Sequence, residues 1–524
     1  MQEVQETLLG CSLESQGDER PKDCGEHQEK DNSCLGPGGR NHNRRRGSNG
    51  DRRRALRFAS MYMGEDAEAF NWDADRLMIR SPITGSRGPR FEMTAEDWET
   101  HRPVLADDLS PFEDVPGTGA DRNPMAVADG NDDTIFSEVL QRMNRRMARG
   151  DVPLNLTASS LITHAFLYTG EDKYRQWVLD YLDAWRRRTE ANRGITPDNI
   201  GPSGLIGECM DGMWWGGYYG WRWPHGAVSI LEPLLIAGAN AQLLSGQESH
   251  LDLYAGQLDG LWERGRTDQG DFKIPHRHGD TGWFDYREPE SSGFIHLNFL
   301  RGSEADRARL ARCLAPRPSP RLGQFGEGGQ YSPQACLAEL RRRDQSRGYH
   351  PERLMRCTLD EVERRLEVMA NDNGNPNEWD VHHWQDINPV LTDPLLQLTS
   401  GSPGVIYHGG LCHARIRHFD PEARRPRLPD RVAALVSRIR PESVDLEFVN
   451  LHGSQTRNVM VQAGAFGEHL FTQVLRIDDG NEVPVENLRK SKTLEAQLQP
   501  ASSLRLRLHM LRFSSKPSYA FPWS

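Results

Sequence analysis

The chain of 524 residues lacks the run of about 18 apolar residues that a membrane-spanning helix requires. Its first residues carry neither the basic start nor the apolar stretch of an export signal. The formal net charge of -11 disfavours nucleic acid and anionic membranes as main partners. We therefore expect a soluble, cytoplasmic protein with no nucleic-acid or membrane partner. No sequence feature indicates its oligomeric state.

Several catalytic signatures are also missing. The eight cysteines form no Cys-x-x-Cys pair and no Cys/His zinc spacing, which favours free thiols. The chain has no phosphate-binding Gly-Lys-Ser/Thr loop, and Gly-Pro-Ser-Gly at 201–204 is not a nucleophile elbow. Nucleotide cofactors and serine-hydrolase chemistry are therefore disfavoured, and no cofactor or metal is predicted.

Alternating helices dominate the chain after a polar start. Residues 1–52 lack any apolar period, which predicts a disordered tail. Further on, apolar helices end at a Gly that is followed by polar or acidic residues. Such joints occur at Gly64, Gly170, Gly246 and Gly302. Because Gly suits the left-handed position that ends a helix, and acidic residues suit the first turn of the next, each unit is predicted to be a helical hairpin.

The two helices of a hairpin differ in composition. The segments 154–168 and 227–244 are apolar nearly all round, which is typical of helices buried on both sides. The segments 173–190 and 250–264 are amphipathic. We therefore expect an inner and an outer layer of helices, arranged as a toroid of hairpins.

After about Gly410 the apolar period changes from helical to alternating. Four segments predict half-buried strands: 443–451, 457–462, 469–475 and 504–510. The predicted fold class is mainly α, with an (α/α)6-type toroid followed by an antiparallel β-sandwich. The predicted domains are the tail at 1–52, the toroid at 53–410 and the β domain at 411–524.

Hairpins joined in this way and followed by a β-sandwich resemble the six-hairpin, or (α/α)6-toroid, carbohydrate-active proteins. These include glycoside hydrolases and polysaccharide lyases. The hairpin joints at Gly64, Gly170, Gly246 and Gly302 carry the resemblance, which covers roughly residues 54–520. It implies a small-molecule or oligosaccharide substrate.

The stretch 198–226, called the aromatic loop below, is too rich in Gly for a stable helix or strand. Flat aromatic faces suit sugar rings. The predicted substrate-binding residues of the loop are Trp214, Trp215, Tyr218, Trp221, Arg222 and Trp223. The alternative is an aromatic plug that fills the mouth of the toroid. The interleaved Gly residues favour a functional loop, because a plug needs little backbone freedom.

Glu208 and Asp211 are the acidic candidates of this loop. The two carboxylates of a glycosidase flank the scissile bond at roughly 5 to 9.5 Å. Residues three apart in sequence seldom do so, and a partner carboxylate is expected from a later insertion. The later insertions supply the catalytic candidates Asp285, Glu378 and Asp380 and the substrate-binding candidates Trp283, His382 and Trp384.

Our leading hypothesis is hydrolysis of a glycosidic bond in an oligosaccharide or uronate-containing sugar. A lyase would instead use Tyr219 or His225 as base, with Arg222 or Arg277 neutralising a uronate carboxylate. Related toroids also carry out terpenoid dehydration and isomerisation, for which the aromatic loop would line an apolar pocket. A sugar-binding or scaffold protein without catalysis is a further alternative.

Metal binding rests on two histidines. His276 and His278 would share one face of a strand, but the sequence assigns no third ligand.

Overall fold

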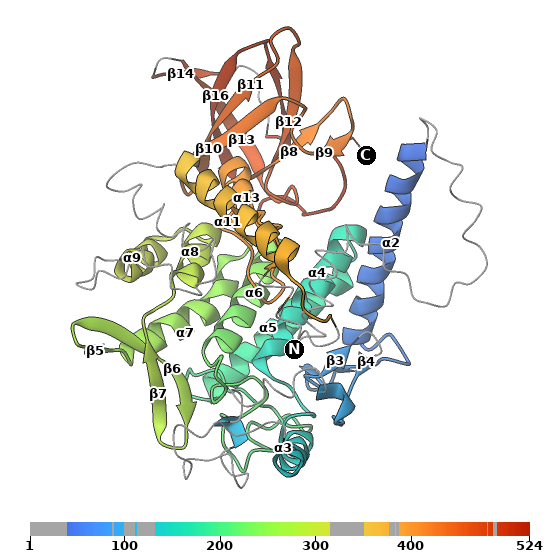
Figure 1. Cartoon of the computed structure of the whole chain (residues 1–524), viewed down its shortest axis with the longest axis vertical. Coiled ribbons are helices and arrows are strands. Elements are labelled where there is room, and N and C mark those ends of the chain that lie inside the picture. The colour runs from blue at the N-terminus through green and yellow to red at the C-terminus, as the bar shows by residue number, and fades with distance from the viewer. Residues whose placement is uncertain are drawn as a thin grey trace.

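The computed structural model describes residues 39–85, 88–98, 110–112, 132–314, 351–376, 383, 387–478, 480–485 and 490–523. In Figure 1 the helices occupy the middle of the molecule and two β-sheets lie at one end. Helix α2 (Gly39–Tyr62) includes the last part of the predicted tail. The expected tail boundary at residue 52 therefore falls inside a helix. Residues 1–38 lie outside the described residues.

Helical hairpins make up the centre of the described chain. The three hairpins are α4 (Ala158–Thr169) with α5 (Asp172–Ala191), α6 (Val228–Ser245) with α7 (Asp252–Glu263), and α8 (Ser291–Leu300) with α9 (Glu304–Cys313). Helix α6 packs against α4, α5, α7 and α8, and α2 packs against α4. The short 3-10 helices η4 (Pro153–Thr157) and η5 (Glu248–Leu251) precede α4 and α7.

The predicted helix ends are confirmed. Gly64, Gly170, Gly246 and Gly302 have φ of 72°, 70°, 76° and 68°. The backbone N–H groups of Gly170 and Gly246 donate to the carbonyls of Phe166 and Gln242 at 2.7 and 2.8 Å. A side chain would strain this left-handed backbone, which explains why Gly stands at each joint.

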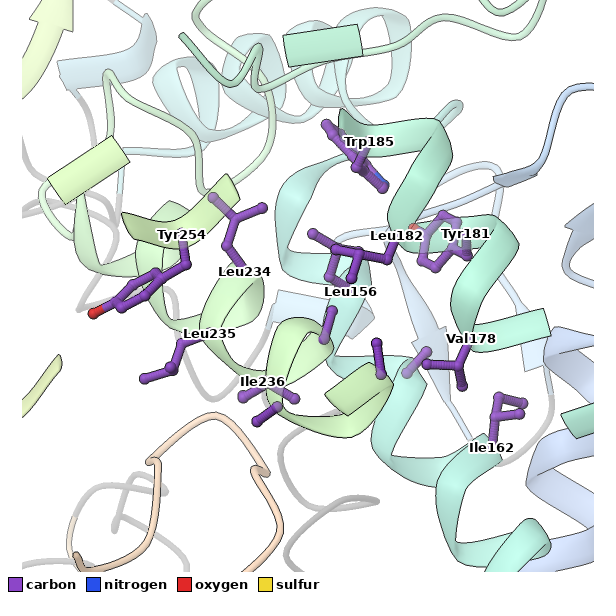
Figure 2. Close-up of a cluster of buried hydrophobic side chains, with 14 of the residues drawn as sticks. Leu156, Ile162, Val178, Tyr181, Leu182, Trp185, Leu234, Leu235, Ile236 and Tyr254 are labelled. Carbon is purple, nitrogen blue, oxygen red and sulfur yellow. The ribbon is translucent and has the colours of Figure 1, made fainter. Parts of the chain in front are cut away.

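The expected difference between inner and outer helices is also confirmed. Helices α4 and α6 are buried nearly all round, whereas α5 buries one face that includes Trp177, Tyr181 and Trp185. Figure 2 shows side chains from these helices in one apolar cluster. By length and composition α6 could cross a membrane, and 78% of it is buried inside the protein.

The C-terminal part contains two antiparallel sheets. Their strands are β8 (Ile416–Asp420), β9 (Arg425–Pro426), β10 (Val432–Ile439), β11 (Ser443–Asn450), β12 (Arg457–Ala463), β13 (Leu470–Asp478), β14 (Asn481–Pro484), β15 (Thr493–Leu498) and β16 (Ser503–Leu511). One sheet has the order β10-β11-β16-β13-β14 and the other β15-β12-β8-β9. Phe448, Leu508 and Val461 from the two sheets share one buried core, so the predicted sandwich is confirmed. The domain limits at 410 and 411 stay predictions.

Smaller elements complete the described fold. Helix α3 (Asp133–Arg146) lies at the end opposite the sandwich, and α11 (Pro351–Asn371) and α13 (Asp393–Ser400) lie beside the sandwich (Figure 1). Strands β5 (Arg266–Asp268), β6 (Asp271–Gly279) and β7 (Gly282–Arg287) follow α7 and precede α8 in the sequence, and they form a three-stranded sheet. The remaining short elements are β1 (Trp72–Asp73), β2 (Met78–Ile79), β3 (Thr84–Gly85), β4 (Gly88–Pro89), η1 (Glu96–Trp98) and η3 (Ser110–Phe112).

Two arginines of the β domain hold the last turn of α8. Arg512 donates through Nη2 to the carbonyls of Phe299 and Leu300, at 2.7 and 2.6 Å. Arg415 donates to the Phe299 carbonyl at 3.2 Å. The end of an inner helix is therefore bonded directly to the sandwich.

Candidate functional site

Asp198 organises the aromatic loop from a fully buried position. Its carboxylate accepts hydrogen bonds from the backbone N–H groups of Gly216, Gly217 and Trp221 at 2.9, 2.9 and 2.7 Å. The side-chain amide of Asn199 donates to the same carboxylate at 3.0 Å. Burial raises the pKa of Asp198, whereas these donors act in the opposite direction.

The glycines of the loop allow close packing around this carboxylate. A Cβ on Gly217 would lie 2.2 Å from the Asp198 carbonyl oxygen, and one on Gly220 would lie 2.0 Å from Asp198 Oδ2. From the sequence we interpreted these glycines as a sign of backbone freedom. At Gly217 and Gly220 close packing against Asp198 requires Gly, so these two positions do not distinguish a functional loop from a plug.

We predict that Asp198→Asn destabilises the protein by about 2 to 4 kcal/mol, because an amide nitrogen would face backbone donors that now meet a carboxylate oxygen. Urea unfolding followed by circular dichroism measures this change. Asp211→Asn in the same loop is the control, since Asp211 is exposed. Equal midpoints for the two variants would show that Asp198 does not hold the loop.

Four of the six aromatic candidates in the aromatic loop are buried inside the protein. Tyr218, Tyr219, Trp221 and Trp223 are buried. The ring of Tyr219 stacks on Trp223 with centroids 4.5 Å apart, and Tyr218 meets Tyr219 edge-on at 4.7 Å. The packing alternative therefore accounts for these four rings, which contribute to the core rather than to a surface for sugar rings.

Trp214, Trp215 and Trp283 are half-buried and surround one histidine. Their ring centroids lie 4.6, 4.7 and 4.8 Å from that of His278. Burial, with a smaller contribution from Arg264, lowers the pKa of His278 to about 4. The histidine is therefore neutral at pH 7, and its ring occupies the space between the three indoles.

The polar candidates of the loop are tied to nearby groups or exposed. Glu208 is exposed and accepts hydrogen bonds from the backbone N–H and the hydroxyl of Ser203, both at 2.8 Å. Asp211 is exposed in a turn with φ of 53°. His225 is exposed, with its ring centroid 5.5 Å from that of Tyr219.

The remaining candidates lie in the loop and in later insertions. Arg222 of the loop is buried and donates to Asp280 at 2.6 Å. Asp285 accepts two hydrogen bonds from Arg287, at 2.9 and 2.5 Å. Glu378, Asp380, His382 and Trp384 lie outside the described residues. The described candidates are thus dispersed over the loop and the β6–β7 hairpin.

A cavity of about 760 Å³ lies instead beside the first half of α6. Its walls come from α6, α7, the middle of β6, the end of β7 with residues 288–290 after it, the first half of α8, and residues 405–407. Its size is within the range of ligand-binding sites. No residue in our predicted catalytic or substrate-binding set lines this cavity. His276, considered above as a metal ligand, does line it.

Glu232 is an acidic group in the cavity wall, on the otherwise apolar helix α6. The ring Nδ1 of the buried His408 makes a short hydrogen bond with its Oε2. Because a carboxylate can only accept, this contact places the proton on Nδ1 and fixes the orientation of Glu232. A carboxylate held in this way can take up or deliver a proton from a defined position.

Glu290 is a second acid in the same wall, at the residue before α8. Its side chain makes no capping hydrogen bond to that helix. Burial and the negative charge of Glu232 raise the pKa of Glu290, while Arg287 acts in the opposite direction. The residue is open to the solvent of the cavity, yet its carboxylate is partly desolvated and electrostatically coupled to Glu232.

Tyr254 completes this wall from α7. Its hydroxyl points away from the apolar cluster in Figure 2, and a Cβ on Gly293 would lie 1.9 Å from it. Burial, with the charges of Glu232 and Glu290, raises the pKa of Tyr254. The phenol is therefore protonated at neutral pH and lies near both carboxylates.

The aromatic loop contacts the elements that form the cavity walls. The backbone N–H of Ala227, just after the loop, donates to the His276 carbonyl at 2.8 Å, and that of His278 donates to the Trp221 carbonyl at 3.0 Å. These bonds join the loop to β6, while Ala227 leads directly into α6. The loop thereby positions two walls of the cavity.

Our sequence analysis did not identify Glu232, Glu290, Tyr254 or His408 as candidates. One usable signal existed, because Glu232 is the single charged side chain in the apolar α6. The described residues contain no group of three His, Cys, Asp or Glu side chains placed to hold a metal ion. Among them, Cys209, Cys313 and Cys412 form no disulfide.

The fold and cavity define a protein of helical hairpins with a C-terminal β-sandwich and an acidic cavity in its helical part. The family described as "Domain of unknown function (DUF8034)" matches residues 47–274 and 266–396, and the chain belongs to this family. A search of curated proteins gave no significant match. Among solved structures, the chain is weakly similar to a glycoside hydrolase family 76 (mannosidase) protein, Bt3792, from Bacteroides thetaiotaomicron VPI-5482. The identity is 11%, the TM-score is 0.23, and the match covers 61% of this chain and 87% of that one.

Proposed function

We propose that the protein is a carbohydrate-active enzyme that hydrolyses a glycosidic bond. Glu290 acts as the acid that protonates the leaving oxygen, and Glu232 acts as the base or nucleophile. The observation that carries this proposal is the pair of coupled carboxylates in one cavity, where the charge of Glu232 raises the pKa of Glu290. Glycoside hydrolysis uses two carboxyl groups in one site, one as the acid and the other as the base or nucleophile.

The fold adds support of a second kind. We propose that the hairpins α4–α5, α6–α7 and α8–α9 belong to the predicted (α/α)6-type toroid, since their inner and outer helices alternate as that fold requires. The resemblance to six-hairpin proteins implies a small-molecule or oligosaccharide substrate. The expected cytoplasmic location stays a prediction.

Elimination is less well supported than hydrolysis. A lyase needs a base that is readily deprotonated and a cation that neutralises the substrate carboxylate. In the cavity, burial and, to a smaller extent, the neighbouring carboxylates raise the pKa of Tyr254, and Arg287 is paired with Asp285. Both features oppose proton abstraction from a uronate.

The other two alternatives are also less well supported. A terpenoid site would be almost free of charge, whereas Glu232, Glu288 and Glu290 line this cavity. A scaffold protein with a blocked cavity does not fit an open volume of about 760 Å³.

A panel of di- and oligosaccharides, with products followed by nuclear magnetic resonance, tests the proposal. Wild type is expected to cleave at least one member by adding water, without forming an unsaturated product that absorbs near-ultraviolet light. The double variant Glu232→Gln/Glu290→Gln should lose this activity while keeping its circular dichroism spectrum.

Two further variants separate the cavity from the aromatic loop. Glu263→Gln, at the exposed end of α7, is the matched control and should keep full activity. Glu208→Gln tests one of the two acids that the sequence suggested in the aromatic loop. If Glu208→Gln abolishes cleavage and the double variant does not, the site lies in the aromatic loop and our assignment to the cavity is wrong.

A further inference from the structure

Helix α11, which lies beside the sandwich in Figure 1, has two different faces. Leu354, Thr358 and Arg365 are buried, and Arg365 donates through Nη1 to the Asn388 carbonyl at 2.7 Å. Leu354 also packs with Leu398 of α13. Beside this buried face lies an apolar stripe, called the α11 seam below. It consists of Met355, Leu359, Val362, Leu366 and Met369.

The α11 seam is largely open to solvent. Leu359, Leu366 and Met369 are 54%, 49% and 42% exposed, and Met355 and Val362 are half-buried. Together with Val368, the three exposed members make up four of the 14 large apolar side chains that are exposed among the described residues. One helix therefore carries an unusual share of them, and exposed apolar side chains that gather in one place mark an interaction site.

The spacing of the seam indicates what kind of element covers it. Its five residues follow one another at intervals of four, three, four and three residues. This period of 3.5 residues is that of a coiled coil, in which the apolar residues of one helix pack between those of another. The same spacing would suit a helix buried in its own chain, but Leu359 and Leu366 are exposed. The expected partner is therefore another helix.

A second copy of α11 fits the seam when the two helices run antiparallel. In that arrangement Met355 of one copy lies opposite Leu366 of the other, and Leu359 lies opposite Val362. Each of these apolar residues therefore meets an apolar residue. The two-fold symmetry that relates the helices repeats every contact, as in the closed interface of a dimer.

The charges beside the seam favour the same arrangement. With the helices antiparallel, Arg356 of each copy lies opposite Glu363 of the other. Both side chains are exposed, and Arg356 also pairs with Glu352 one turn earlier in its own helix. In a parallel pair, Arg356 and Glu363 would instead lie opposite Pro351 and Thr358, which carry no charge. Charge complementarity therefore selects an antiparallel second copy.

We propose that the α11 seam binds a second copy of this chain and forms an antiparallel dimer. The seam spans 14 residue steps, or about 21 Å of helix. Such an interface is smaller than that of a permanent dimer, so a Kd of roughly 10 μM is expected. The inference is independent of the proposed function, because no residue of α11 is among those that line the cavity.

Sedimentation velocity of the full chain between about 1 and 200 μM brackets such a Kd and tests the proposal. Wild type should pass from monomer to dimer. The double variant Leu359→Glu/Leu366→Glu should stay monomeric and keep its circular dichroism spectrum, since both side chains are exposed. Leu205→Glu/Leu451→Glu adds the same two charges at positions that are 65% and 63% exposed, and this control should dimerise as wild type does.

Two results of this experiment would overturn the proposal. The first is a wild-type protein that stays monomeric over the whole range. If Leu359→Glu/Leu366→Glu also unfolds at lower urea concentration than the control, another segment of the same chain covers the seam. The second is a dimer that Leu359→Glu/Leu366→Glu leaves intact, which would place the interface elsewhere.

Charge reversal tests the antiparallel arrangement itself. Arg356→Glu and Glu363→Arg should each weaken dimerisation about tenfold, because each brings like charges together in both halves of the interface. The double variant, and an equal mixture of the two single variants, should dimerise as wild type does. The two positions lie about 10 Å apart along one helix, so this recovery requires a second copy. Absence of recovery would show that the proposed pairing is wrong.

Discussion

Exchange of Glu290 for Gln is expected to lower kcat/KM for the cleaved sugar by roughly 10²- to 10⁴-fold, because the leaving oxygen would lose its general acid. Glu290 must be protonated to act. Burial and the charge of Glu232 on α6 raise its pKa, and Arg287 at the end of β7 lowers it. Activity should therefore fall as the pH rises through the pKa of Glu290. The Glu290→Gln variant should lack this alkaline limb.

The coupling between the two carboxylates gives a second readout of the same assignment. In Glu232→Gln the neighbouring negative charge is gone, so the pKa of Glu290 should fall and the alkaline limb should move to lower pH. Carbon-13 nuclear magnetic resonance of labelled Glu measures this pKa even where activity is lost. A pKa of Glu290 that does not change in Glu232→Gln would contradict the coupling on which the assignment rests.

Exchange of Glu468 for Gln is expected to change how stability depends on pH. Glu468, two residues before β13, is 1% exposed, and its Oε2 accepts a hydrogen bond from the Phe466 N–H at 2.8 Å. Burial raises its pKa from 4.5 to about 7. The difference corresponds to about 3 kcal/mol of the free energy of unfolding.

The sign of this effect follows from proton binding. The folded protein binds the proton of Glu468 more tightly than the unfolded chain, so this contribution is present below pH 4.5 and is lost as the pH rises through about 7. Glutamine stays neutral throughout. The difference in stability between the Gln variant and wild type should therefore grow by about 3 kcal/mol from pH 4 to pH 8.

Urea unfolding of both proteins across this pH range measures the difference. Other groups with shifted pKa, such as Asp151, titrate equally in both proteins and cancel. Glu495→Gln on β15 is the matched control, since Glu495 is exposed, and its difference from wild type should stay constant. If the difference in stability between Glu468→Gln and wild type is also independent of pH, the pKa of Glu468 is the same in the folded and unfolded protein and this prediction is wrong.

Local patterns predicted much of the fold because they report local physical constraints. A left-handed helix end requires Gly, so the joints at Gly170 and Gly246 could be located without a structure. Alternating apolar residues predicted β11 and β16 with nearly correct limits, since a strand in a sandwich buries one face. Composition did not predict that α2 begins at Gly39, because this stretch is polar and has little apolar pattern, and the limit of the tail stays a prediction.

The cavity could not be predicted in the same way. Glu232 and His408 are 176 residues apart, and only the packing of α6 against residues 405–407 brings that part of the chain to the same wall. Composition drew attention to the aromatic loop, but rings such as Trp221 and Trp223 are also the largest fillers of a core. The glycines beside these rings allow the backbone to pack closely around Asp198. Composition alone does not distinguish such packing from a flexible binding loop.

Two arginines of the C-terminal part connect the β-sandwich to the cavity through α8. Arg512 and Arg415 anchor the last turn of this helix, and the first turn of the same ten-residue rod forms part of the cavity wall beside Glu290. Because α8 is a short rigid helix, a change in its orientation at the Leu300 end also moves its first turn next to Glu290. If Glu290 is the acid that we propose, removing the sandwich is expected to change the position of Glu290 relative to Glu232 and to lower activity, although neither residue is altered.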